Sequence, residues 1–340
     1  MAYVRKWGED HISKSLKQID SETWLIGDLV LHRSPYPSDV ATCNDDSDNP
    51  SDVATCNDDS DNPSDVATWK DDSDNSSYTL TEAPTPLPSA TTPPDSPYIK
   101  LIYKAGDARA IWSIGNSVVC KAAYTMEGIT PESVSLNFVR DQQPSTFETP
   151  KVLHHAFASD RSFLFYQRLP GRTLLAAWPN LDEYWRSKYV TAVVDACMEM
   201  AEWKGQVFGG VDGQNLPEYY LHLTRLEGAE GFSSTNLQAS CELLGMDCSN
   251  LVFSHNCLAP ETIIVEDEPR SGKIGLIAWG IAGYLPRTWI RTKCPIFASM
   301  YLPPEVADRS WFAREVTIAL GVDGFDEVVE AYRKWLPSKH

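Results

Sequence analysis

Apolar and polar residues follow two different patterns along this chain, and the change falls close to Thr173. From Tyr98 onward the apolar residues come in short runs rich in β-branched and aromatic side chains, separated by pairs that contain glycine. Such runs predict β-strands. We expect strands at 99–103, 110–114, 117–121, 151–155 and 162–169, the first three as an antiparallel meander. A helix is expected to begin after Thr130-Pro131-Glu132, because proline suits the first turn.

After Thr173 the apolar residues recur every three or four positions, as on one face of an α-helix. Helices are expected at 174–178, 182–205, 216–227, 235–244, 303–320 and 326–335. A paired β unit interrupts them, with strands at 251–254, 263–265 and 273–278. A small antiparallel β-rich lobe (98–169) before a larger helical lobe (170–340) predicts an α+β fold with two lobes.

The first 97 residues have a different character. A short helix followed by a strand at 23–32 is expected within the extension 1–36. Three tandem copies of Pro-Ser-Asp-Val-Ala-Thr-x-x-Asp-Asp-Ser-Asp-Asn then occupy 37–49, 50–62 and 63–75, the third with Trp69-Lys70 where the others have Cys-Asn. One valine and one alanine per copy do not offset the entropy of ordering it, so we expect 37–97 to be disordered. A calcium-binding role is the alternative, although the copy lacks the glycine and closing glutamate of an EF-hand loop.

Composition narrows the class of protein. The net charge is −18, but the repeats at 37–75 contain twelve aspartates and one lysine, so only −7 remains for the rest. No basic stripe favours nucleic acid. No apolar run is long enough for a membrane span, and the first residues do not read as a signal peptide. Eight cysteines without a CxxC pair argue against zinc or a disulfide framework, and reduced thiols fit a cytoplasmic location.

Several local motifs occur in a fixed order. They are Val118-Val-Cys-Lys121, Glu132 at a helix start, Phe147-Glu-Thr-Pro-Lys-Val152, the segment 165–178, the loop 255–263 and Ile277-Ala278-Trp279. Together they resemble the fungal branch of the aminoglycoside phosphotransferase and choline-kinase-like family, which has the protein-kinase-like fold. The resemblance runs from about Tyr98 to the C-terminus. It implies that Lys121 contacts nucleotide phosphates and that Glu132 pairs with this lysine.

The catalytic loop of that family reads His-Gly/Ala-Asp-Leu-x-Pro-x-Asn-Ile, and its metal loop reads Ile-Asp-Trp/Phe. This chain keeps the framework residues of both loops, at His255, Leu258, Pro260, Ile263, Ile277 and Trp279. It departs from them at the three positions that provide the catalytic base and the metal ligands. Cys257 stands in place of the catalytic base, Thr262 in place of the metal-binding asparagine and Ala278 in place of the metal-binding aspartate.

These three replacements remove what phosphoryl transfer needs. Ala278 offers no side-chain oxygen to a hard cation, and the Thr262 hydroxyl is a poorer ligand than an amide carbonyl. Cys257 is not a carboxylate and cannot orient an acceptor hydroxyl as one. Loss of a general base costs about two to four decades in rate, and loss of the metal costs several kcal/mol more. The resemblance therefore implies a pseudokinase that requires no cofactor and binds ATP only weakly or without Mg²⁺, with a nucleotide or small molecule in the interlobe cleft.

Other interpretations stay open. Lys121 is alternatively a surface lysine, Glu132 an acidic helix start, and His255 a buried structural residue. A repurposed enzyme could use Cys257, His255 and Trp279 for non-phosphoryl chemistry, such as a cyclisation in fungal secondary metabolism. A weak small-molecule kinase could use Lys121 and Glu132 with Glu261 as a surrogate acid, and Glu266, Asp267 and Glu268 could rescue metal binding. The acceptor and the oligomeric state are left open.

Overall fold

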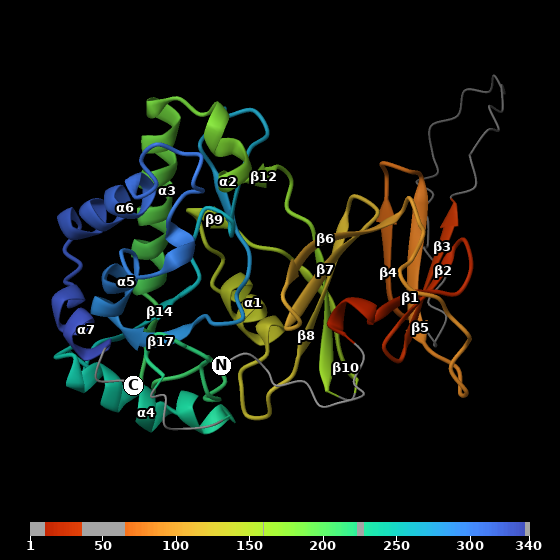
Figure 1. Ribbon diagram of the computed structural model, residues 1–340, viewed down its shortest axis with the longest axis horizontal. Coiled ribbons are helices and arrows are strands. Elements are labelled where there is room, and N and C mark those ends of the chain that lie inside the picture. The colour runs from red at the N-terminus through yellow and green to blue at the C-terminus, as the bar shows by residue number, and fades with distance from the viewer. Residues whose placement is uncertain (1–10, 36–64, 159, 223–227, 337–340) are drawn as a thin grey trace, which may run out of the picture. The chain divides into compact units, whose positions relative to one another are not determined.

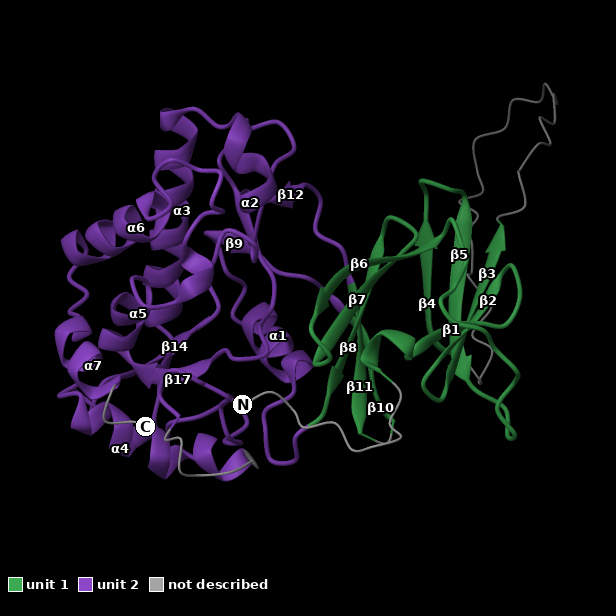
Figure 2. Ribbon diagram, viewed as in Figure 1, with its two compact units in different colours: residues 1–125, 153–166 green, residues 126–152, 167–340 purple. Residues whose placement is uncertain are grey.

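The computed structural model describes residues 11–35, 65–158, 160–222 and 228–336. The chain divides into two compact units (Figure 2). Unit 1 comprises Met1–Thr125 and Leu153–Tyr166, and unit 2 comprises Met126–Val152 and Gln167–His340. Within the described ranges, no helix combines the length and the apolar character that crossing a bilayer demands.

Unit 1 contains two five-stranded sheets (Figure 1). The first is antiparallel throughout, in the order β1-β2-β3-β5-β4, with strands β1 (Leu16–Gln18), β2 (Thr23–Ile26), β3 (Leu29–Pro35), β4 (Asp65–Asp71) and β5 (Ser76–Glu82). The second has the order β10-β11-β8-β7-β6, with strands β6 (Ile99–Ala105), β7 (Arg109–Ile114), β8 (Val118–Tyr124), β10 (Val152–Ala158) and β11 (Arg161–Gln167). Strands β6, β7 and β8 form the predicted antiparallel meander.

One cluster of buried apolar side chains is shared by both sheets of unit 1. Trp24 and Tyr78 come from the first sheet, Trp112 and Phe163 from the second, and all four are at most 1% exposed. Burying a side chain of this kind stabilises a fold by about 1.5–3 kcal/mol relative to leaving it in water. The N-terminal extension is therefore part of the same folded unit as the β-rich lobe.

The prediction that all of 37–97 is disordered is wrong for the third copy of the repeat and the segment after it. Residues 65–71 form β4 and residues 76–82 form β5, while the first two copies lie outside the described residues. Trp69 is 7% exposed and stacks on Tyr78 with ring centroids 5.8 Å apart. Only the third copy has this aromatic residue, and its buried area offsets an ordering cost that one valine and one alanine do not.

Two aspartates of the third copy bind the rest of unit 1. The Asp71 carboxylate is 2% exposed and accepts hydrogen bonds from the backbone N–H groups of Asn116 (2.6 Å) and Ser117 (3.3 Å), in the turn between β7 and β8. Burial acts to raise the pKa of Asp71, but its hydrogen bonds from Ser73, Asn116 and Ser117 outweigh this and lower the pKa below the ordinary value. Asp74 forms an ion pair with Arg33 on β3 (3.2 Å). These contacts fix the copy in place.

The predicted helix and single strand near the N-terminus are also corrected. Residues 12–14 form one short 3₁₀ turn, followed by strand β1. The expected strand at 23–32 is a hairpin, β2 and β3, that turns at Gly27 with φ +61°. Glycine adopts this left-handed conformation without the steric cost that a Cβ brings.

Unit 2 holds all seven α-helices of the described residues. They are α1 (Glu132–Asp141), α2 (Leu174–Ala177), α3 (Glu183–Ala201), α4 (Ser234–Leu243), α5 (Arg287–Lys293), α6 (Trp311–Val322) and α7 (Val329–Trp335). Two small sheets accompany them. One has the order β12-β15-β16-β9, with β12 (Arg172–Thr173), β15 (Ile263–Val265), β16 (Ile274–Leu276) and β9 (Phe147–Glu148), and the other is β13-β14-β17, with β13 (Lys204–Gly205), β14 (Leu251–Ser254) and β17 (Gly283–Pro286).

Two helix predictions in unit 2 need correction. Residues 216–222 form turns instead of a helix, and 223–227 lie outside the described residues. Pro217 disfavours the helical conformation of Leu216, and both Leu216 and Leu221 are buried without a helix. The predicted helix at 303–320 begins only at Trp311, after the Pro303-Pro304 pair. Strand β17 and helix α5 were not predicted.

The α+β class is confirmed, with antiparallel sheets in the N-terminal part and the helices in the C-terminal part. The boundary differs from the predicted one at residue 169. Helix α1 and strand β9, expected in the β-rich lobe, group with unit 2. Strand β9 pairs in parallel with β16, Phe147 opposite Ile274, which ties this segment to the helical part.

Candidate functional site

The two loops that carry the predicted chemistry both lie in unit 2. The first, residues 255–262, connects β14 to β15, and the second, residues 277–282, connects β16 to β17. The antiparallel pairing of β15 with β16 places the end of the first loop beside the start of the second. The N–H of Ile277 donates to the carbonyl of Thr262 at 3.0 Å. The predicted positions 257, 262 and 278 therefore belong to one local structure.

His255 joins the two loops from inside the protein. Its side chain is fully buried, and its Nε2 lies 2.9 Å from the carbonyl oxygen of Ile277. Its Nδ1 accepts the backbone N–H of Cys257 at 3.1 Å, so the proton is on Nε2, which donates to Ile277. The ring meets Trp279 edge-on, with centroids 4.4 Å apart. His255 is thus a buried structural histidine, and its Nδ1 is not available as a base for the Cys257 thiol.

The hydroxyl of Thr262 is hydrogen-bonded within the first loop itself. Its Oγ1 donates to the carbonyl of Cys257 at 2.7 Å and accepts the N–H of Ala259 at 3.0 Å. The residue is 7% exposed. A hydroxyl with this set of partners closes the loop, and it is a poor candidate for a metal ligand.

Ala278 occupies an unusual backbone conformation. Its φ is +70°, in the left-handed region that aspartate and asparagine enter far more readily than alanine. The backbone here has a shape suited to the aspartate that the resemblance implies, while the side chain carries no oxygen. The alanine side chain itself therefore does nothing to favour this left-handed conformation.

Glu132 acts on the second loop. From the first turn of α1, its Oε1 accepts the backbone N–H of Trp279 at 3.1 Å. Trp279 is fully buried and stacks on Phe147 of β9 and Phe253 of β14, at 5.9 Å and 6.3 Å. Lys121, its predicted partner, belongs to unit 1, where it lies on β8 and is 7% exposed. The contact of Glu132 with the second loop was not predicted from the sequence.

Of the acidic residues considered as substitutes, Glu261 belongs to the first loop, whereas Glu266, Asp267 and Glu268 lie in the turn between β15 and β16. Glu266 begins the turn between β15 and β16, and its carboxylate accepts N–H groups from Arg270, Ser271 and Gly272 at 3.0–3.2 Å. Burial acts to raise the pKa of Glu266, but these hydrogen bonds prevail and lower it to about 2. Glu268 pairs with Arg270 on the surface. Glu261 is exposed.

Sequence reasoning missed a buried ion pair behind the first loop. Glu218 is fully buried and Lys293 of α5 is 6% exposed, and the Lys293 ammonium contacts both Glu218 and the carbonyl oxygen of Asn256. No sequence pattern indicates this pair, because single charged residues are ordinarily solvated. Lysine and glutamate are almost never fully buried unless they are paired.

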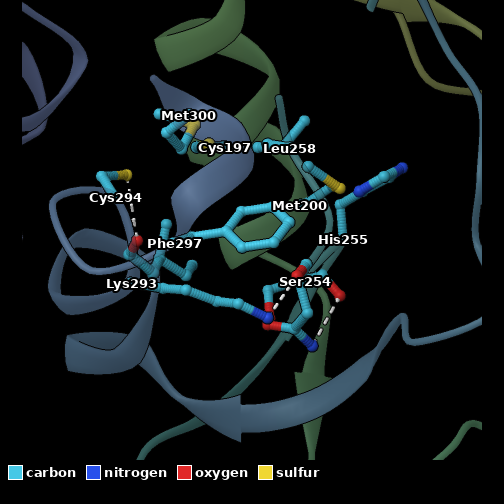
Figure 3. Close-up of a pocket in the computed structure, with 11 residues that line it drawn as sticks. Cys197, Met200, Ser254, His255, Leu258, Lys293, Cys294, Phe297 and Met300 are labelled. Carbon is cyan, nitrogen blue, oxygen red and sulfur yellow. Dashed lines mark hydrogen bonds between the residues drawn. The ribbon is translucent and has the colours of Figure 1, made fainter. Parts of the chain in front are cut away.

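A small cavity lies next to this pair (Figure 3). It measures about 30 Å³, which is the space of roughly one water molecule. Figure 3 shows Lys293, Ser254 and His255 on one side of it and Met300 and Cys197 on another. A cavity of this size excludes a nucleotide, so it is a feature of the packing beneath the loop.

The left-handed backbone at Ala278 leads to a stability prediction. Ala278→Gly is expected to raise the free energy of unfolding by up to about 1 kcal/mol, because relief of the left-handed strain exceeds the entropy that glycine adds to the unfolded chain. Urea unfolding measures the change. Ala282→Gly is the matched control, since Ala282 is buried and has no positive φ, and it should destabilise. Equal destabilisation by both substitutions would contradict the prediction.

No protein-family model and no curated protein matches the chain. Its structural neighbours are aminoglycoside phosphotransferases, which have the protein-kinase-like fold. Aminoglycoside phosphotransferase APH(3'')-Id from Streptomyces rimosus has 14% identity and a TM-score of 0.47, over 70% of this chain and 90% of that one. ADP-bound APH(2'')-Ib has 14% identity and a TM-score of 0.41, over 69% and 80%.

A third neighbour is a thermostable mutant of APH(4)-Ia in a ternary complex with AMP-PNP and hygromycin B. It has 16% identity and a TM-score of 0.43, over 69% of this chain and 82% of that one. Because identities and scores are this low, we infer neither an activity nor a ligand for this chain from these neighbours.

Proposed function

We propose that this protein is a pseudokinase of the aminoglycoside phosphotransferase type, which binds a nucleotide or another small molecule without Mg²⁺ and transfers phosphate no faster than background. The observation that carries the proposal is the state of positions 257, 262 and 278. One holds a thiol, one a hydroxyl bound to its own loop, and one a methyl group. None of these is a carboxylate that could orient an acceptor or hold a hard cation.

The geometry of the loops supports a binding role over a repurposed nucleophile. Activation of Cys257 as a nucleophile needs an adjacent base. His255, the nearest candidate in sequence, is fully buried and directs Nε2–H to Ile277, while its Nδ1 accepts the N–H of Cys257. Lys121 remains our proposed contact for nucleotide phosphates, and Glu132 remains its proposed partner, on the strength of the motifs around them.

A thermal-shift titration with ATP and ADP, each in Mg²⁺ and in EDTA, tests this proposal. Ligand at about a hundred times its Kd adds roughly 2.7 kcal/mol to stability. We expect the same shift with Mg²⁺ and with EDTA. Lys121→Met is expected to reduce the shift, whereas Lys104→Met, an exposed lysine in the same sheet, should leave it unchanged.

Two results would count against the proposal. A shift that requires Mg²⁺ would mean that a metal site persists. Turnover of a phosphorylated product that depends on Mg²⁺ and on Lys121 would mean that the protein is a working kinase. If neither nucleotide produces a shift, the protein does not bind nucleotides, and its proposed ligand is another small molecule.

A further inference from the structure

Burial of the charged pair Glu218 and Lys293 costs free energy, and the position of the pair indicates a structural role. Both charges are removed from water, and the desolvation of two charges can exceed their mutual attraction. An ion pair is therefore weak evidence for stability alone. The role of the pair follows from the other groups that these two side chains contact.

Glu218 is held rigidly. Its Oε2 accepts the indole N–H of Trp289 at 3.2 Å as well as the Lys293 ammonium, and its Oε1 accepts the backbone N–H of Tyr220 at 3.1 Å. The ammonium also lies 5.4 Å from the ring centroid of Tyr220 and 5.1 Å from that of Phe297. Aromatic faces attract a cation at such distances. The ammonium therefore has a fixed place.

From this place the ammonium donates to the carbonyl oxygen of Asn256 in the first loop. Asn256 has φ +57°, the left-handed conformation, and its side chain is bound on both sides. Its Oδ1 accepts the Ser254 hydroxyl at 2.7 Å and its Nδ2 donates to the carbonyl of Ile281 at 3.0 Å. The backbone therefore bends at Asn256, immediately before Cys257, and Lys293 holds the carbonyl of that left-handed turn.

We propose that Lys293, held by Glu218, is a positioning residue: its charge fixes the left-handed turn at Asn256 and thereby the place of the residue-257 side chain, without any divalent ion. The independence from ions rests on the proposed function, but the role of Lys293 does not. A permanent internal charge supplies the order that the loop of a metal-dependent kinase could draw from its bound ion.

Hydrogen exchange of the amides in 255–262 tests the proposal, read together with urea unfolding. The N–H groups of Cys257 and Ala259, bonded to His255 and Thr262, report directly on the loop. Lys293→Met should speed their exchange by at least about tenfold, because a hydrogen bond to a charged donor is lost. This variant also leaves Glu218 buried and unpaired, so it should destabilise unit 2 as a whole.

The double variant Glu218→Gln with Lys293→Met separates the two effects. It removes both charges, so global stability should largely return, while exchange in 255–262 should stay fast because the ammonium no longer donates to the carbonyl oxygen of Asn256. Cys294→Ala is the matched control: it enlarges the same cavity from the next residue of the chain, but the thiol that it removes donates to the carbonyl oxygen of Ile290. It should leave loop exchange at the native rate.

The outcomes are distinct. Native exchange rates in the double variant would overturn the role of Lys293, and so would fast loop exchange in Cys294→Ala. If the native protein exchanges equally in Mg²⁺ and in EDTA, the ion-independent part is supported. If EDTA alone loosens the native loop while Lys293→Met still has its effect, the pseudokinase proposal fails and the positioning role stands.

Discussion

Trp69→Cys is expected to destabilise unit 1 by about 2–4 kcal/mol. The variant gives the third copy of the repeat the residue that the first two copies have at this place, Cys43 and Cys56. Trp69 is 7% exposed and stacks on Tyr78, and its ring centroid lies 6.4 Å from that of Phe165 in the second sheet. Among the described residues its indole N–H has no acceptor, which reduces the loss and keeps the expected value below the upper end for tryptophan.

Hydrogen exchange in β4 and β5 is the suitable measurement, because two compact units can unfold separately. We expect exchange in both strands to become much faster. Lys70→Asn is the matched control, since it makes the other half of the same Trp-Lys to Cys-Asn replacement at an exposed position, and it should change stability by no more than about 0.5 kcal/mol. Unchanged protection of β4 in Trp69→Cys would show that the tryptophan does not order the third copy.

Restoring Cys257→Asp, Thr262→Asn and Ala278→Asp together is expected to create magnesium-dependent ATP binding. The carboxylate at 278 and the amide oxygen at 262 supply oxygen donors of the kind that a hard cation requires, and the carboxylate at 257 restores the catalytic base. Aspartate also tolerates the φ of +70° at position 278 better than alanine does. Thr262→Asn costs about 1 kcal/mol, because the hydroxyl that closes the loop on Cys257 is lost. With Mg-ATP at about a hundred times its Kd, the restored protein should gain roughly 2.7 kcal/mol.

Thermal shift in Mg²⁺ and in EDTA measures this gain. The control carries asparagine at all three positions, which keeps the side chains similar in size but removes the carboxylate charges, and it should show no magnesium dependence. A magnesium-dependent shift in the native protein would contradict the premise that its metal ligands are lost. A restored protein that is folded yet shows no such shift would contradict the assignment of positions 257, 262 and 278.

Much of the fold followed from local pattern. The meander β6–β8 was readable because short β-branched runs are separated by glycine-containing turns, and helix α3 because its apolar residues recur at helical spacing after Asp182. The same kind of pattern led to the wrong prediction of a helix at residues 216–222. Apolar spacing there resembles a helix, but Pro217 and the burial of Glu218 against Lys293 impose turns. A pattern of apolar residues does not reveal which polar neighbour is paired across the fold.

The sequence by itself determined which chemical groups are present at positions 257, 262 and 278, because the absence of a carboxylate is a fact of composition. It also determined the α+β class through its two periodicities. Only the tertiary structure decided that His255 has both ring nitrogens engaged, that Thr262 binds its own loop, and that the third copy of the repeat is a strand. These depend on partners up to tens of residues distant in the chain, and hydrogen bonding and burial are settled only when such partners meet.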